Sequence, residues 1–266
     1  MNFLQIIILG LVQGFSEFLP ISSSGHLILI NKFFGWTTSS MSFDVFLHLG
    51  TLVAVFVFLR SDVKKIFVSF LNFLKSKNLK ENKLWLLVLV GILPAGMVGL
   101  WMGDLIEGNF RNIYLVAFDL IFFGFVLWFA EKKYEQKKEE RVKVASEMSI
   151  KKSLMIGLWQ VLALLPGTSR SGITITGGMF AGLDKETAVR FSFLMSIPLI
   201  LGANILKVKD IMVSNISFWE MGLGFLVSFL AGLVAIKWLV KIASAKNFKP
   251  FVVYRIILGV LILLFL

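Results

Sequence analysis

Long apolar runs, separated by short polar intervals, follow one another along most of the chain. They lie near 43–60, 84–103, 112–130, 187–206, 217–240 and 250–266. Each is close to the roughly 17–25 residues that a transmembrane helix needs. Runs of this number and length are too extensive to be buried in one globular core of a 266-residue chain. The pattern therefore predicts an all-α polytopic membrane protein with six transmembrane helices.

Basic residues alternate from one side of these runs to the other. Lys and Arg are concentrated in the intervals 60–83, 131–152 and 237–249, and the other connections carry few cations. Cytoplasmic loops of membrane proteins are enriched in Lys and Arg, so the three basic intervals are assigned to the cytoplasm. The six spans alternate under this assignment, and both ends of the chain fall on the outer side.

Two further apolar segments, about 3–34 and about 153–183, are interrupted near their middles by Pro, Gly and Ser. If either were one ordinary crossing, the charge pattern beyond it would be reversed. Each is therefore expected to enter the membrane and return as a re-entrant helical hairpin. Irregular backbone at membrane depth persists only where it is buried in protein or lines a wet cavity. The hairpins are the expected location of a functional site.

The two interrupted segments also resemble each other. A shift of 147 positions superimposes Gly10, Leu11, Gln13, Ser22, Ser24 and Gly25 on Gly157, Leu158, Gln160, Ser169, Ser171 and Gly172. The chain then reads as a single membrane domain, 1–266, with one hairpin and three spans in each half, 1–131 and 150–266. Because three is odd, the halves have opposite orientation. Inverted-topology repeats of this kind place a site where their discontinuous helices meet.

Polar residues in the two hairpin loops have the composition of an anion site. Arginine presents a fork of donors that matches phosphate, and helix N-termini favour anions. Glu17 and His26 add a proton acceptor and donor of the kind that phosphoryl transfer uses, and Arg170 would hold the phosphate. Either Ser23 or His26 could be the nucleophile. The residues predicted to bind substrate are Gln13, Ser22, Ser24, Gly167, Thr168, Ser169, Ser171 and Thr174.

Three motifs in this order resemble the undecaprenyl-diphosphate phosphatase family of bacteria, which is also known for bacitracin resistance. They are Q-x-x-x-E at Gln13–Glu17, S-S-S-G-H ending at His26, and P-G-T-S-R-S-G at Pro166–Gly172. The resemblance implies an enzyme that converts undecaprenyl diphosphate to undecaprenyl phosphate, the lipid carrier for cell-wall glycan. It assigns the catalytic positions to Glu17, Ser23, His26 and Arg170.

The same resemblance implies a location and a cofactor. The location is the bacterial cytoplasmic membrane, with the active site open to its outer face, and the cofactor is a divalent cation, Mg²⁺ or Ca²⁺. Glu17 is the candidate metal ligand. The family has Glu or Gln at the first position of its first motif, and Gln13 here leaves a single carboxylate. That substitution puts a metal site built on two carboxylates of this motif in doubt.

Other functions remain to be distinguished. A polyprenyl-phosphate transporter or flippase could use the same phosphate site, but it would need charge complementarity and no acid–base pair such as Glu17 and His26. A lipid phosphatase of the PAP2 type is disfavoured, because its K-x-x-x-x-x-x-R-P motif is absent and no His follows Arg170 by six residues. The net charge of +11 is assigned to loops facing anionic membrane lipids and does not indicate nucleic-acid binding.

Three ionisable residues outside the motifs have no assigned role. Asp44 and His48 are one helical turn apart near the start of a span and are expected to pair with each other. Asp119 falls in the middle of a span and is expected to point into the helix bundle.

Four other segments are expected to be structural. The pairs Gly99–Gly103 and Gly178–Gly182 match G-x-x-x-G and predict close helix packing. Residues 62–75 predict an amphipathic helix on the inner leaflet. The mixed-charge run 131–143 predicts a solvated cytoplasmic helix or loop.

Overall fold

The computed structural model describes residues 1–36, 41–79, 82–136, 141–213, 216–245 and 247–266, and these are almost entirely helical. Within that part of the chain there is no sheet, only an isolated bridge between Val142 and Leu183. The all-α prediction is confirmed. Helices occupy all six predicted spans: α3 (Met41–Phe58), α5 (Leu84–Phe110), α6 (Ile113–Gln136), α9 (Lys185–Leu206), α11 (Phe218–Ala245) and α12 (Lys249–Phe265).

Several of these helices can cross a bilayer by length and composition. Among the described residues four qualify, namely α5, α6, α9 and α11, and a fifth does so if α3 and α4 (Arg60–Ser76) are counted as one bent span. The helix α12 is shorter, with 17 residues. Large apolar side chains remain exposed along all of them, as expected where lipid replaces water. The chain is therefore an integral membrane protein.

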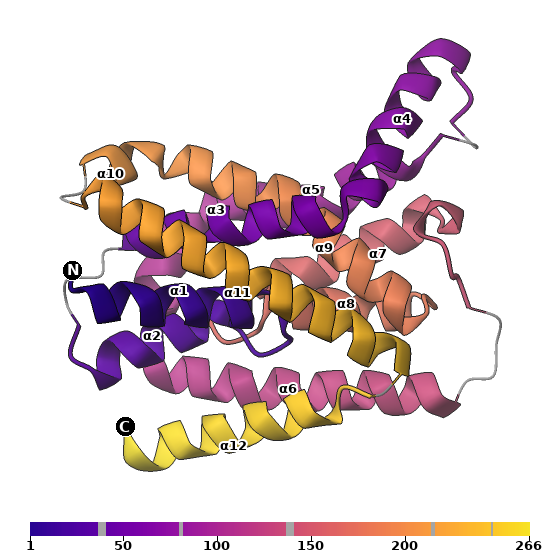
Figure 1. Cartoon of the computed structure of the whole chain (residues 1–266). Coiled ribbons are helices and arrows are strands. Elements are labelled where there is room, and N and C mark those ends of the chain that lie inside the picture. Colours follow the sequence, from indigo (N-terminus) through magenta and orange to yellow (C-terminus); the bar gives the residue numbers. More distant parts are fainter. Residues whose placement is uncertain (37–40, 80–81, 137–140, 214–215, 246) are drawn as a thin grey trace.

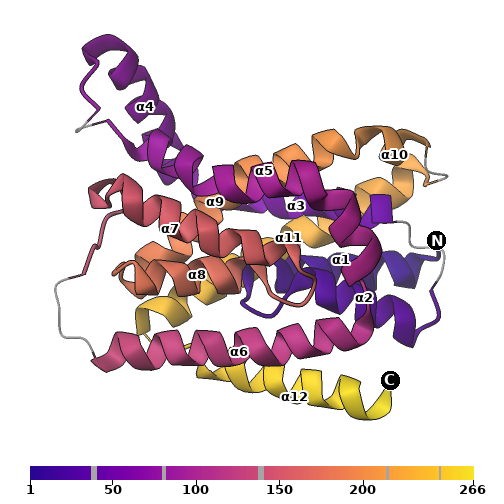
Figure 2. The same cartoon turned by 180° about the vertical axis from the view of Figure 1, so that it is seen from behind.

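Both interrupted segments fold as pairs of short helices. The first pair is α1 (Phe3–Phe18) with α2 (Ser23–Phe33), and the second is α7 (Ile150–Val161) with α8 (Arg170–Phe180), joined through the 3₁₀ turn η2 (Leu162–Leu164). The pairs start from opposite ends of the bundle and their connecting loops lie near its middle (Figures 1 and 2). The first loop touches the start of α8, because the Ser171 hydroxyl donates to the Leu19 carbonyl at 3.0 Å.

Each pair packs against a helix from the other half of the chain. Helix α1 lies along α11, and α7 lies along α5. Glycines permit the close approach: a Cβ added at Gly10 would lie 2.9 Å from Val227, and one at Gly157 would lie 2.5 Å from the Gly91 carbonyl oxygen. Helices α6 and α12 pack side by side (Figure 2). The core thus interleaves the two halves of the chain.

Helix α4 projects from the bundle (Figure 1). It turns by 79° from α3 after Leu59, and none of its side chains is buried. Its rings reach α5, since Phe70 and Phe73 each lie 5.3 Å from the Trp85 ring. The predicted helix over 62–75 is confirmed as a helix. Two short elements complete the described chain, η1 (Ala145–Glu147) and α10 (Val208–Val213).

The two ends of the bundle carry different elements. Both termini lie at one end with α10, and the opposite end carries α4 and the connection between α6 and α7 (Figure 1).

The connection between α6 and α7 belongs to the run 131–143, of which 137–140 lie outside the described residues. The prediction that this run is solvated is wrong at Glu131, which is buried and accepts from Lys185 at 2.5 Å and from the Phe248 N–H. A buried carboxylate requires such donors, and here they join α6 to α9 and α12.

Candidate active site

Glu17, near the end of α1, is the centre of the site. Its side chain is only 6% exposed, and both of its oxygens are bonded. Oε1 accepts from the Arg170 guanidinium at 2.7 Å. Oε2 accepts from the Ser23 hydroxyl at 2.7 Å and from the Gln13 amide at 3.1 Å. The structure therefore brings together four residues predicted from the motifs.

Local structure explains how these residues meet. Gln13 precedes Glu17 by one helical turn, so the two share a face of α1. Ser23 is the first residue of α2 and Arg170 is the first residue of α8, and these two positions are 147 apart, as in the repeat. A tip-to-tip arrangement of the two hairpins consequently places the hydroxyl and the guanidinium on the same carboxylate.

The two helix starts are built alike. Ser22 caps α2 with φ 76° and accepts from the Gly25 N–H, and Ser169 caps α8 with φ 73° and accepts from the Gly172 N–H. A serine cap satisfies one of the N–H groups that a helix start leaves open. The remaining N–H groups of the two starts contribute positive potential beside Glu17, which suits an anionic ligand.

The other predicted binding residues have defined places in the second loop and on α8. Ser171 is bonded to the first hairpin, and the Thr174 hydroxyl lies 2.6 Å from that of Ser192 on α9. Gly167 makes the turn with φ 101°. Thr168 is buried, and its hydroxyl has no hydrogen-bond partner among the described residues. Ser24, in contrast, is exposed to a cavity.

His26 faces away from the Glu17 cluster. Its Nδ1 lies 2.7 Å from the Ser22 carbonyl and its Nε2 lies 2.6 Å from the Tyr254 hydroxyl. The rings of His26 and Tyr254 are stacked, with centroids 5.6 Å apart. Because Nδ1 faces a carbonyl, it carries the hydrogen, and in the neutral ring Nε2 accepts from the tyrosine hydroxyl.

The imidazole that contacts Glu17 within the described chain is His48 of α3. Its Nε2 lies 3.3 Å from Glu17 Oε2. Its Nδ1 lies 2.8 Å from the backbone carbonyl of Asp44, so the expected Asp44–His48 pairing runs through the main chain. Both neighbours are acceptors, and the ring satisfies both only as imidazolium. The sequence signal was a histidine in an apolar span, where ionisable groups are usually functional.

Arg255, in α12, was also missed. It is fully buried and donates to four backbone carbonyls: Pro20 in the first hairpin loop, Gly167 in the second, and Asp119 and Leu120 in α6. Asp119, expected to point into the bundle, is half-buried beside it. A lone arginine inside the last apolar run was the signal that could have identified it.

Two adjoining cavities meet at this cluster. The smaller, of about 220 Å³, is lined by Glu17, His48 and Arg170 among mostly apolar residues. The larger, of about 490 Å³, shares His48 and continues along α5 toward Arg111. The larger cavity is lined by both apolar and charged residues. A pocket with a cation beside apolar walls fits an amphiphile with an anionic head.

The two glycine motifs differ in how far they match the predicted helix packing. Gly99 and Gly103 line the larger cavity, and a Cβ added at Gly103 would have no described atom within 4 Å. The predicted close packing is wrong at Gly103, whereas a Cβ added at Gly99 would make an ordinary contact at 3.6 Å. Gly178 does pack closely, since an added Cβ would lie 2.8 Å from Ala188. Gly182 makes a turn with φ 81°.

A divalent cation is poorly matched by the side chains of this cluster. Hard cations require several oxygen ligands. In the described ranges no three His, Cys, Asp or Glu side chains gather as a metal site. Both oxygens of Glu17 already accept hydrogen bonds, and Gln13 contributes an amide donor. The residues as arranged do not fit a cation held by protein side chains alone.

Comparison with known proteins covers nearly the whole chain. The family described as bacitracin resistance protein BacA matches residues 6–261. The chain belongs to the BacA family. The match includes both hairpin loops and Arg255, so every residue of the site falls within the matched region.

Three relatives of this BacA-family chain illustrate the similarity. Undecaprenyl-diphosphatase of Saccharophagus degradans is 39% identical over 260 residues, covering 97% of this chain and 96% of that protein. Undecaprenyl-diphosphatase 1 of Pseudoalteromonas translucida is 39% identical, and undecaprenyl-diphosphatase of Aliivibrio salmonicida is 40% identical. The last two alignments cover 100% of this chain and 99% of each relative. The family resemblance inferred from the motifs is confirmed.

Proposed function

We propose that this chain is an undecaprenyl-diphosphatase, which hydrolyses undecaprenyl diphosphate to undecaprenyl phosphate and inorganic phosphate. The observation that carries this proposal is the 2.7 Å contact between the Ser23 hydroxyl and Glu17, next to Arg170. A nucleophile bonded to a base beside a phosphate-binding cation is the arrangement that phosphoryl transfer uses. The names of the relatives agree with it. The activity regenerates the lipid carrier for cell-wall synthesis and accounts for bacitracin resistance.

In the first step, Ser23 Oγ attacks the terminal phosphorus. Its proton passes to Glu17 Oε2, the oxygen to which it is already bonded. The bond between the terminal phosphorus and the bridging oxygen breaks, and undecaprenyl phosphate leaves as the anion. Arg170 and the N–H groups at the starts of α2 and α8 stabilise charge on the transferred group. Ser23 is preferred over His26 as nucleophile, because both ring nitrogens of His26 have other partners.

In the second step, water hydrolyses the phosphoserine. Water attacks the phosphorus, the bond from phosphorus to Ser23 Oγ breaks, and Glu17 returns to that oxygen the proton it took in the first step. Both protons of the water stay on the inorganic phosphate that departs. His48 holds Glu17 Oε2 and balances its charge during both steps. His26 lies one helical turn beyond Ser23 on α2, where donation toward the leaving oxygen would require it to release Tyr254.

The lipid substrate explains why the site lies inside the bundle. Extracting a long polyprenyl chain into water would cost roughly 0.8 kcal/mol per CH₂ group. The apolar residues of α5 that line the larger cavity offer the chain a route that stays at membrane depth. The carrier or flippase alternative lacks a reason for the bond between Ser23 and Glu17, so the enzyme is favoured.

The proposed architecture is six transmembrane helices and two re-entrant hairpins in an inverted-topology repeat, with halves 1–131 and 150–266. The matching serine caps at Ser22 and Ser169 support it, as does the exchanged packing of α1 on α11 and α7 on α5. We place the protein in the bacterial cytoplasmic membrane, with the site open to the outer face. Support comes from the larger cavity, which reaches Arg111 and Lys207 at the end opposite the basic connections.

The divalent cation inferred from the family stays a prediction. The cluster does not hold it unaided, so no step above depends on it. A cation would instead enter with the diphosphate oxygens of the substrate. Phosphate release measured in a chelator and then with added Mg²⁺ or Ca²⁺ tests this.

The decisive experiment measures phosphate release from undecaprenyl diphosphate by the detergent-purified protein. Ser23→Ala is expected to lower the rate by about three orders of magnitude, because it removes the nucleophile. Ser244→Ala, which removes an exposed hydroxyl at the opposite end, is the matched control. With substrate labelled in its terminal phosphate, rapid acid quenching should trap label on Ser23 of the wild type. No release by the wild type under any cation condition would shift the assignment to the carrier, to be tested by lipid translocation.

A further inference from the structure

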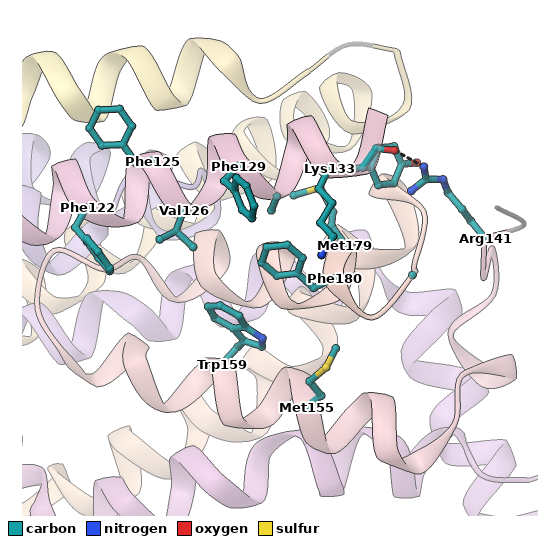
Figure 3. A pocket seen from close by; sticks show the side chains of 13 residues that line it. Phe122, Phe125, Val126, Phe129, Lys133, Arg141, Met155, Trp159, Met179 and Phe180 are labelled. Carbon is teal, nitrogen blue, oxygen red and sulfur yellow. Dashed lines mark hydrogen bonds between the residues drawn. The ribbon is translucent and has the colours of Figure 1, made fainter. Parts of the chain in front are cut away.

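A third cavity lies on the side of the bundle between α6 and α7, with α8 as its floor (Figure 3). Helices α6 and α7 each pack against α8 and so form the two walls. The cavity measures about 700 Å³, within the roughly 300–1,000 Å³ range of ligand sites. It shares no lining residue with the two cavities of the Glu17 site. The catalytic proposal leaves it unexplained.

Aromatic side chains make this cavity a trough. Phe122, Phe125 and Phe129 follow one face of α6 at helical spacing, and each is about half exposed. Trp159 of α7 and Phe180 of α8 complete it, with ring centroids 5.5 Å apart. Figure 3 shows Phe122 and Phe125 toward one end of the trough and Arg141 at the other. Such a trough fits a long apolar chain.

Positive charge is confined to that second end. Lys133 Nζ lies 5.8 Å from the Phe180 ring, and the Arg141 guanidinium stacks 3.3 Å from the Tyr134 ring while donating to the Tyr134 carbonyl. None of the described residues that line the cavity is acidic. Glu131, on the same part of α6, does not line the cavity, and it is buried and paired with Lys185.

We propose that this trough binds an anionic phospholipid. Its phosphate would contact Lys133 and Arg141, and one acyl chain would lie along Phe129, Phe125 and Phe122. The combination of charge and trough favours this occupant: a free anion would not need the aromatic wall, and a zwitterionic lipid would bring its own cation to the basic end. Basic pockets between transmembrane helices on the cytoplasmic side are suited to anionic lipid head groups.

Native mass spectrometry and thermal unfolding of the detergent-purified full chain test the proposal. Phosphatidylglycerol is expected to remain bound and to raise the Tm, whereas phosphatidylcholine with the same acyl chains is not. Replacing both cations, Lys133→Gln with Arg141→Gln, should weaken phosphatidylglycerol retention roughly tenfold or more. The control Lys143→Gln with Lys151→Gln removes the same charge from exposed positions outside the cavity and should retain the lipid.

A second variant removes the trough and keeps the charge. Val126→Trp fills the space between Phe122 and Phe129 and should also abolish retention of the lipid. Because this variant tests the trough without a change of charge, the proposal does not depend on a charge variant that could merely unfold. Equal retention of phosphatidylcholine, or unchanged retention in both cavity variants, would overturn the proposal. Preferential binding of undecaprenyl phosphate would also overturn it, since the trough would then hold the lipid carrier. Phosphate release is measured in parallel, so a failure of the catalytic proposal is recognised separately.

Discussion

Glu17 is held by residues that come from three other helices as well as its own. Arg170 of α8, Ser23 of α2 and His48 of α3 surround the carboxylate, and Gln13 approaches it from the preceding turn of α1. A carboxylate buried at this depth requires such donors to stay ionised. The same bonds aim Oε2 at the Ser23 proton, so the arrangement that stabilises the charge also prepares the nucleophile.

Replacing this carboxylate with an amide tests its role as a base. Glu17→Gln keeps the shape of the side chain but cannot take the Ser23 proton and no longer balances Arg170. Loss of a general base typically costs about 10²- to 10⁴-fold, and a drop in kcat of that size is expected. The measurement is phosphate release at saturating lipid. Glu186→Gln makes the same change at an exposed carboxylate paired with Arg190 and should leave the rate intact.

The two histidines offer a direct comparison of sequence and structure. His48→Gln removes the imidazole beside Glu17 and is expected to lower kcat by about tenfold or more, the worth of one charge-assisted hydrogen bond. His26→Gln removes the partner of Tyr254, and its effect should be the smaller of the two. The measurement is the rate of phosphate release by the two purified variants. A large fall in the rate for His26→Gln, together with a normal rate for His48→Gln, would assign the catalytic role to the imidazole of His26.

The motifs identified Glu17, Ser23 and Arg170 because their residue types and spacing suit phosphate chemistry. They could not identify His48, which lies in another helix and reaches Glu17 only through the packing of α3 on α1. Conversely, His26 follows three serines in the sequence, yet the turn of α2 directs it to α12. Neighbourhood in the chain and neighbourhood in space differ most at a site assembled from several helices.

At the scale of the elements, the apolar runs predicted where the long helices and the interrupted pairs begin to within about three residues, but α5, α6 and α11 extend five to seven residues beyond the predicted ends. The direction of α4 was not predictable, because the break at Leu59 depends on how α3 packs on α9 and how α4 packs on α5. The spacing Gly99–Gly103 predicted packing but lines a cavity, since G-x-x-x-G records small residues and not what lies against them. The tips of the hairpins depend on unusual backbone, which serine and glycine in the sequence only suggested.

The tip of the second hairpin is sensitive to a single methyl group. At Gly167, with φ 101°, a Cβ would lie 2.7 Å from the Val116 carbonyl oxygen and 2.8 Å from Asp119. Gly167→Ala is therefore expected to lower both the Tm and the rate of phosphate release, by displacing Arg170 from Glu17. Gly35→Ala is the control, because Gly35 also has positive φ (64°) but no described atom within 4 Å of the added group. Equal effects of the two variants would assign the damage to backbone strain and not to the contact with α6.

At the scale of the whole molecule, the two hairpin tips are fastened to the same side chain. Arg255 lies in the last helix, yet it donates to Pro20 at 3.2 Å and to Gly167 at 3.0 Å, and its other bonds anchor it on α6. Glu17 is three residues from Pro20 in the sequence, and Arg170 is three residues from Gly167. The bonds of Arg255 to these two carbonyls therefore fix the positions of both side chains. The site is consequently completed only when the C-terminal helix packs, which no local motif in the hairpins could reveal.

The bonds from Arg255 to both hairpin tips give the sharpest test of the assembled fold. Arg255→Lys keeps the charge but cannot reach carbonyls in several directions, because lysine lacks the planar fork. Carbonyls left without donors in the buried centre should cost on the order of 3 kcal/mol, seen as a lower Tm of the purified protein. The rate of phosphate release should fall as well, although Arg255 is expected to touch no substrate, since the two tips would lose their common anchor. Arg60→Lys, at an exposed arginine of α4, makes the same substitution and should change neither quantity. A variant at 255 with normal Tm and normal rate would show that contacts such as Ser171 to Leu19 suffice to join the hairpins.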